Sequence, residues 1–200
     1  MKRSPAVVFA VVALFVLGAC GGGDKKPTTS AATTASTAGD SLKVWQTAPP
    51  WPLTDRQADR IADAGLPLLT AEGTKVHYHA HLDVFRNGDP VTVPANIGID
   101  YQRQVISPLH THDDSGIVHV EGLKDEPITL GQFLTEWGVR VESDCTGDIC
   151  PPDPIAVYVD GVKQTGPVTE LVFKSRQEVA LVLGTPPKTI PSTFANMPAQ

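Results

Sequence analysis

The 200-residue chain has little basic charge, only two methionines and only three cysteines. Its 16 Lys and Arg residues stand against 22 Asp and Glu residues, for a formal net charge of -6 without a basic stripe. Nucleic acid is therefore excluded as the expected partner. Neither a Gly-rich phosphate loop nor a Gly-x-Ser-x-Gly sequence is present, which argues against a P-loop and against an α/β-hydrolase site. Met1 begins the N-terminal segment and Met197 lies in the tail, so no methionine-rich Cu⁺ site is expected.

The N-terminus has the pattern of a secretory targeting segment. Two basic residues precede an apolar run from Ala6 to Leu17, which is too short to span a membrane as a mature helix. The run closes with Leu-Gly-Ala-Cys at 17–20, which resembles the lipobox of bacterial lipoproteins. The resemblance implies that residues 1–19 are a signal peptide and that Cys20 carries lipid. The protein is then expected outside the cytoplasm, anchored to the cell membrane.

The two other cysteines, Cys145 and Cys150, are predicted to form a disulfide. Outside the cytoplasm, two remaining thiols usually pair. A metal site is the alternative, but the usual zinc spacing is tighter and is repeated along the chain. The disulfide would close a short loop and hold a turn.

Composition divides the rest of the chain into three parts. Residues 20–52 are rich in Thr, Ala, Ser, Gly and Pro, so we expect a flexible tether. Trp45 and Trp51 near its end either dock on the domain or mark the ragged start of the domain. Residues 53–192 are expected to form a single globular domain, and residues 193–200 an irregular tail.

The clearest strand prediction follows the tether, where apolar and polar side chains alternate. One face takes Val76, Tyr78, Ala80, Leu82 and Val84. The other face takes His77, His79, His81 and Asp83. Asn87-Gly88 then predicts a two-residue hairpin turn, which pairs Val84 with Val91. The same turn pairs Leu82 with Val93 and so keeps the apolar face apolar on both strands.

A second hairpin is predicted around the later histidines. A four-residue loop over Asp113–Gly116 places His110 opposite His119. The same loop places His112 opposite Ile117, so that all three rings share a face with the Glu that follows. A three-residue loop would flip one strand and separate them. The sequence does not decide between the two loop lengths. The prediction that matters for function is that the three histidine rings lie on one face of the hairpin.

Two helices are predicted from capping boxes, at Thr54–Gln57 and at Thr129–Gln132. Gly65 ends the first and Gly138 the second. The second helix has apolar residues at helical spacing: Leu130, Phe133, Leu134 and Trp137. Strands are expected over 156–159, before an Asp-Gly turn, and over 179–183.

The order of these elements is helix, hairpin, histidine hairpin, helix, strand, strand, which predicts an α+β fold with a small mixed β-sheet and one packed helix. The part from the second helix to the strand at 157–161 resembles the β-grasp arrangement of ubiquitin-like and sulfur-carrier proteins. In this arrangement the histidine hairpin would be an insertion. A cupredoxin-like or cupin-like β-sandwich is the competing fold.

All six histidines lie between residues 77 and 119 and follow the two-residue period of a strand. Neutral imidazole is the commonest metal ligand, so we expect a metal site on β-strands. The candidate ligands are His77, His79, His81, His110, His112, His119 and Glu121. Asp83, Asp113 and Asp114 are candidates to hydrogen-bond ligand rings and fix their tautomers. Imidazole and carboxylate donors suit a divalent transition metal, Cu²⁺ or Zn²⁺.

Five segments carry a further likeness: HYHAHLDVF at 77–85, VPANIGI at 93–99, LHTHDDSGIVHVE at 109–121, TLGQF at 129–133 and IPS at 190–192. Together they resemble a group of uncharacterised secreted or lipid-anchored proteins of actinobacteria and archaea. The likeness covers roughly residues 76–192. It implies one domain outside the cytoplasm and supplies no activity.

Three functions remain open at this point. The first is a lipid-anchored protein that binds Cu²⁺ or Zn²⁺ for sequestration, delivery or sensing, with a closed four-ligand site. The second is a metalloenzyme with a three-His site opening on a pocket and an activated water, for which Glu121, Asp113 or Asp114 is the candidate base. The third is a cell-surface module that binds a protein partner, whose histidines respond to pH without metal. Binding is favoured over catalysis, because the sequence names no substrate and no general base beyond these three residues.

Overall fold

The structure is a computed structural model that describes residues 41–142 and 144–198. The expected signal peptide, Cys20 and the tether up to residue 40 lie outside the described residues. Within the described part, no helix has the length and apolar character needed to cross a membrane. The described residues belong to one compact unit.

The helices are α1 (Gln57–Asp63), α2 (Leu130–Trp137) and the short 3-10 helix η1 (Val168–Glu170). The first strands are β1 (Val76–Arg86), β2 (Asp89–Val91), β3 (Ile99–Asp100), β4 (Val105–Ile106), β5 (Leu109–His110) and β6 (Ile117–Gly122). The later strands are β7 (Val141–Glu142), β8 (Cys145–Thr146), β9 (Ile155–Val159), β10 (Val162–Lys163) and β11 (Glu178–Leu183).

Seven strands form one open mixed sheet in the order β10-β9-β11-β1-β6-β5, with β2 paired to β1 beyond the end of β6. β1 and β11 are parallel, and the other pairs of this sheet are antiparallel. The predicted α+β fold is confirmed, and the central parallel pair of first and last strands is the β-grasp arrangement. The histidine hairpin lies between the first hairpin and α2 in the sequence, where an insertion was expected, and its strand β6 pairs with β1 in this sheet. The competing sandwich is wrong, because the other strands described form only two-stranded sheets.

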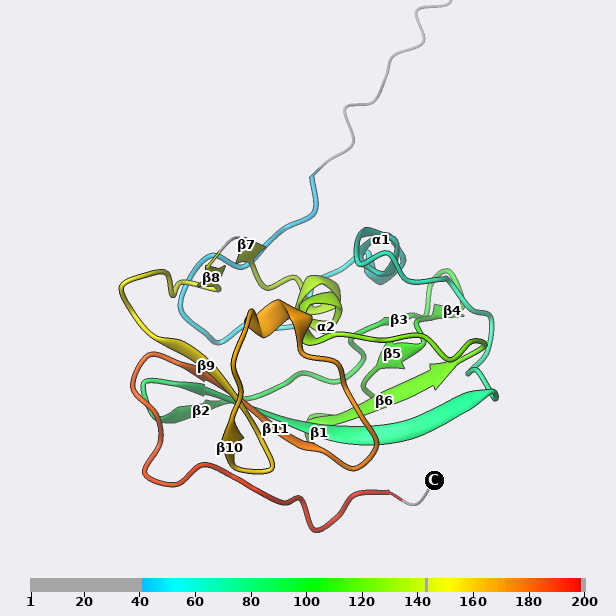
Figure 1. Cartoon of the computed structure of the whole chain (residues 1–200). Coiled ribbons are helices and arrows are strands. Elements are labelled where there is room, and N and C mark those ends of the chain that lie inside the picture. The colour runs from blue at the N-terminus through cyan, green and yellow to red at the C-terminus, as the bar shows by residue number, and fades with distance from the viewer. Residues whose placement is uncertain (1–40, 143, 199–200) are drawn as a thin grey trace, which may run out of the picture. The chain divides into compact units, whose positions relative to one another are not determined.

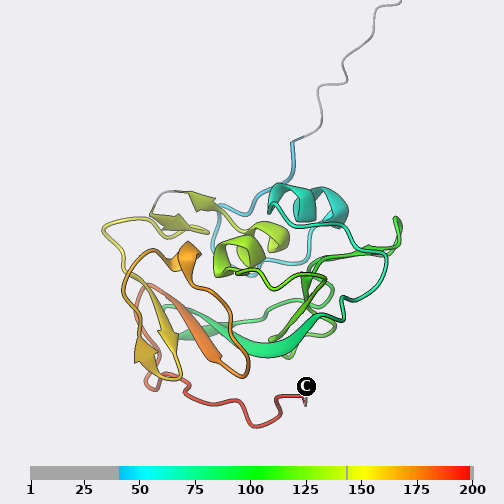
Figure 2. The ribbon, with the colours of Figure 1, turned by 45° about the vertical axis from the view of Figure 1, so that its right-hand side comes forward.

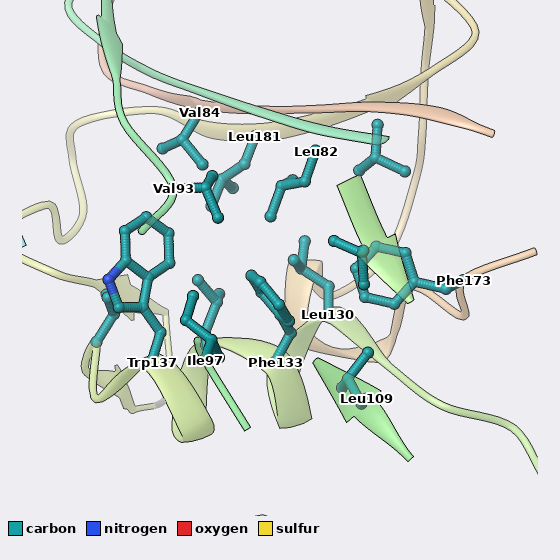
Figure 3. Close-up of a cluster of buried hydrophobic side chains, with 14 of the residues drawn as sticks. Leu82, Val84, Val93, Ile97, Leu109, Leu130, Phe133, Trp137, Phe173 and Leu181 are labelled. Atoms are coloured by element: carbon teal, nitrogen blue, oxygen red, sulfur yellow. The ribbon is translucent and has the colours of Figure 1, made fainter. Parts of the chain in front are cut away.

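The core lies between this sheet and the helices, which cover one of its faces (Figures 1 and 2). Leu82 and Val84 of β1 point toward Phe133 and Trp137 of α2, as Figure 3 shows. The alternation predicted for β1 is therefore confirmed, and its histidines must lie on the sheet face away from α2. The first hairpin pairs Val84 with Val91 as predicted.

The predicted partner of Leu82 in that hairpin is wrong. β2 ends at Val91, and the N–H of Leu82 instead donates to the carbonyl of Gly116, at 2.9 Å. This bond brings the loop between β5 and β6 against the middle of β1. Gly116 has φ +83°, and a Cβ there would lie 2.7 Å from the carbonyl oxygen of Leu82, so this close approach requires glycine.

The two predicted helices are present, but only one has the predicted cap. Thr129 and Gln132 form a reciprocal capping box at α2. The capping box predicted at Thr54 is wrong, because α1 begins at Gln57 and follows Arg56, which has φ 59° and makes no side-chain cap. A carboxylate oxygen of Asp100 accepts from an N–H in the first turn of α1 instead, at 3.1 Å.

Both tryptophans near the expected end of the tether pack on the domain. Trp51 is 1% exposed, and its ring meets that of Trp137 edge to face at 5.6 Å between centroids. The backbone of Trp45 pairs with Val139. The folded part therefore extends before residue 53. The predicted disulfide between Cys145 and Cys150 is present.

Candidate metal centre

Three neighbouring strands place alternate residues side by side on the sheet face away from α2. His79 of β1 pairs with His119 of β6, and His119 pairs with His110 of β5. The predicted register of His110 and His119 is confirmed. The β5–β6 ladder ends there, so His112 and Ile117 do not form a sheet pair. His112 nevertheless joins the face, because its ring lies 4.5 Å from that of His119 between centroids.

His110, His112 and His119 bring three ligand atoms within 4.8 Å of one another. The Nδ1 of His110 lies 3.0 Å from the carbonyl oxygen of Ser107, and the Nδ1 of His119 lies 3.0 Å from Glu121 Oε1. Both acceptors fix the proton on Nδ1 and leave Nε2 with a free lone pair, the arrangement that orients metal-binding imidazoles. The Nε2 of His110 lies 3.2 Å from the Nε2 of His112.

A second group lies beside the first. His77, His79 and Glu121 bring their ligand atoms within the same 4.8 Å of one another. The Nε2 atoms of the two histidines are 3.3 Å apart, and the Nε2 of His77 is also 3.3 Å from Glu121 Oε1. Rings of the two groups meet at His79 and His119, whose centroids are 4.5 Å apart. Five of the six candidate histidines therefore form one continuous cluster.

Burial keeps the inner rings of this cluster neutral. Desolvation and the neighbouring His119 and His112 lower the pKa of His110 to about 3. Burial, with the charge of His112, lowers the pKa of His119 to about 4, and burial also lowers the pKa of His79. A metal ion must displace any proton from its ligand nitrogen. Near neutral pH the lone pairs of these rings are already free.

His81 lies on the same sheet face but outside the cluster. Its Nδ1 lies 2.9 Å from Glu178 Oε2, and its Nε2 lies 2.8 Å from the carbonyl oxygen of Ser115. Burial opposes a charge on His81, but the bond and charge of Glu178 outweigh it and raise its pKa. Both ring nitrogens are thus engaged with acceptors. Phe194 of the segment that passes under the sheet stacks on the ring at 3.8 Å between centroids (Figure 1).

The three aspartates proposed to orient ligand rings contact little of the cluster. Asp83 lies 3.9 Å from the Nδ1 of His81, in a further group of three with Glu178. Asp113 accepts from the backbone N–H of Ser115 at 3.0 Å. Among the residues that the structure describes, no hydrogen bond or ion pair joins Asp113 or Asp114 to a histidine ring.

Two glutamates near histidines were missed by the sequence reasoning. Glu72 precedes β1 in a loop, and its Oε1 lies 3.4 Å from the Nε2 of His112. It also groups with His110 and Glu121 at metal-binding distance. Glu178, the partner of His81, begins β11 at the far end of the domain sequence. Neither residue has a histidine two positions away, so the two-residue period gave no signal for either.

The cluster therefore contains several groups of His and Glu whose ligand atoms lie close enough together to hold a metal ion. None of the protein-family models, curated proteins or solved structures compared with the chain matches it.

Proposed function

We propose that this protein binds a divalent transition metal ion outside the cytoplasm while anchored to the membrane through lipid on Cys20. The observation that carries the proposal is the convergence of His110, His112 and His119. Two of these rings have Nδ1 held by an acceptor, so that Nε2 is available for an ion. Glu121 thus orients His119, and the Ser107 carbonyl orients His110.

Zn²⁺ is the ion that the spacing favours. Two nitrogens bound to Zn²⁺ at 2.0–2.1 Å in tetrahedral geometry lie about 3.3–3.4 Å apart, whereas neighbouring ligands in a square plane lie about 2.9 Å apart. The observed separation of 3.2 Å between His110 Nε2 and His112 Nε2 is closer to the tetrahedral value. Cu²⁺ is the competing ion, because it binds a given set of nitrogen ligands more tightly.

The closed four-ligand site expected for a binding protein is not what the structure brings together, because the group has three His ligands and one of them is half-exposed. The ion would therefore be exchangeable rather than sealed in the fold. The side chain of His112 is 44% exposed, whereas His110 is fully buried. An ion held between them is reachable from one side, which suits sequestration, sensing or delivery to a protein partner at the cell surface. The disulfide supports the proposed compartment, because disulfides persist where the surroundings are oxidising.

The test is elemental analysis of the protein purified without a His-tag, with thermal melting before and after addition of Zn²⁺ or Cu²⁺. We expect bound metal and a raised melting temperature. His112→Ala, a change at a half-exposed side chain, should lose this ion, whereas His81→Gln should keep it. An absence of bound metal together with an unchanged melting temperature for both ions would overturn the proposal.

A further inference from the structure

We propose that the cluster binds two divalent ions at adjacent positions, one on His110, His112 and His119 and the other on His77, His79 and Glu121. This inference rests on the proposed function and extends it from one ion to two. The two groups share no residue, and each brings three ligand atoms within 4.8 Å. Three protein ligands are the number found in open zinc sites, where water or another ligand completes the coordination.

The spacing within the second group also matches a tetrahedral ion. His77 Nε2 lies 3.3 Å from His79 Nε2 and 3.3 Å from Glu121 Oε1, against about 3.3–3.4 Å for ligands on one tetrahedral Zn²⁺. The third separation, from His79 Nε2 to Glu121 Oε1, is 4.0 Å, so a small rotation of one side chain closes the triangle. A single four-coordinate ion would leave at least two of the six donors without a metal.

Burial in the second group gives independent support. His79 and Glu121 are each 3% exposed. The Nδ1 of His79 has no hydrogen-bond partner among the described residues, and it is not the nitrogen that faces the other donors. The other nitrogen of this ring points toward a second imidazole and a carboxylate. A bound ion gives this buried arrangement of donors a common partner.

Glu121 links the two ions. Its Oε1 faces His77 Nε2 of its own group and lies 3.0 Å from the Nδ1 of His119 in the other group. The carboxylate can therefore ligate one ion while it accepts a hydrogen bond from a ligand of the other. Removing its charge should affect both sites, but differently. One site loses a ligand, and the other loses only the group that orients His119.

The first experiment counts Zn²⁺ ions per chain by calorimetric titration and by elemental analysis after dialysis, using the intact protein without a His-tag. Two ions are expected. His77→Ala, at a side chain that is 49% exposed, should reduce the count to one. Glu121→Gln should also reduce it to one and weaken the remaining ion about 10–100-fold, the usual effect of losing an orienting carboxylate. His81→Gln is the matched control and should keep two.

The outcomes separate this inference from the proposed function. A count of one in the unchanged protein overturns the second ion and leaves the proposed function standing, whereas a count of zero overturns both. A second ion that is lost in His81→Gln but kept in His77→Ala would place it at Glu178 and refute the adjacent site.

Electron paramagnetic resonance with Cu²⁺ tests adjacency directly. Filling the second position should diminish the signal of an isolated Cu²⁺ through coupling between neighbouring spins, and His77→Ala should restore the isolated signal. Two full, uncoupled signals at two equivalents would contradict the proposal.

Discussion

In the metal-free protein, His110 should account for part of the pH dependence of the free energy of unfolding. The burial of its ring sets the size of this contribution. His110 is fully buried, with its Nδ1 bound to the Ser107 carbonyl. Its pKa is about 3 in the folded protein, against an ordinary value of 6.5. Between these values the unfolded chain binds a proton that the folded chain does not. The free energy of unfolding must therefore fall as the pH falls, by about 1.4 kcal/mol per pH unit.

From pH 7 to pH 5 the His110 contribution amounts to about 2 kcal/mol, because titration in the unfolded chain begins near pH 6.5. The assay is urea unfolding of chelator-treated protein at both pH values, for the unchanged chain and for His110→Gln. Burial raises the pKa of Glu121 and of Glu136, and these carboxyl groups titrate in both proteins. The contributions of these carboxyl groups therefore largely cancel when the change in unfolding free energy between pH 7 and pH 5 is compared between the two proteins.

The unchanged protein should therefore lose about 2 kcal/mol more than His110→Gln between pH 7 and pH 5. The same pH dependence in both proteins would refute the argument that burial keeps this ring neutral. Added Zn²⁺ should oppose the loss in the unchanged protein, because the ion binds the neutral ring and stabilises the folded state.

Three further predictions concern the free energy of unfolding and involve residues away from the cluster. Thr129→Ala should lower the free energy of unfolding by about 1 kcal/mol, because it removes the cap of α2. Thr54→Val should change the free energy of unfolding little or raise it, because the buried Thr54 hydroxyl has no hydrogen-bond partner among the described residues. If urea unfolding showed the same loss for Thr54→Val as for Thr129→Ala, this prediction would be wrong. Glu178→Ala should lower the free energy of unfolding by about 3–5 kcal/mol, because buried His81 loses the carboxylate to which its Nδ1 is bonded. The same variant should bind as many Zn²⁺ ions as the unchanged protein, and a lost ion would place Glu178 in the metal site.

The sequence predicted β1 well because two independent signals agreed there. Alternation assigned Leu82 and Val84 to the core, and the Asn87-Gly88 turn paired Val84 with Val91. The helix α2 was equally accessible, since its cap and its apolar stripe are both local in sequence. Local patterns of this kind determine which face a residue occupies.

Local patterns could not determine contacts that come from distant segments. His81 has the same period as His79, yet Glu178, 97 residues along the chain, engages it outside the cluster. Thr54 begins the same motif as Thr129, yet Asp100 supplies the carboxylate at the start of α1. The two-residue period of a strand shows which face of the sheet a side chain occupies, but not which residue it contacts there. The histidine cluster could therefore be predicted, but not that His81 lies outside it.

The most direct test of the proposed metal site is a crystal structure of the Zn²⁺-loaded protein, with anomalous scattering recorded at the zinc edge. We expect an anomalous peak about 2.0–2.1 Å from the Nε2 atoms of His110, His112 and His119. A map with no peak at these three rings, or with its only peak between His81 and Glu178, would contradict it.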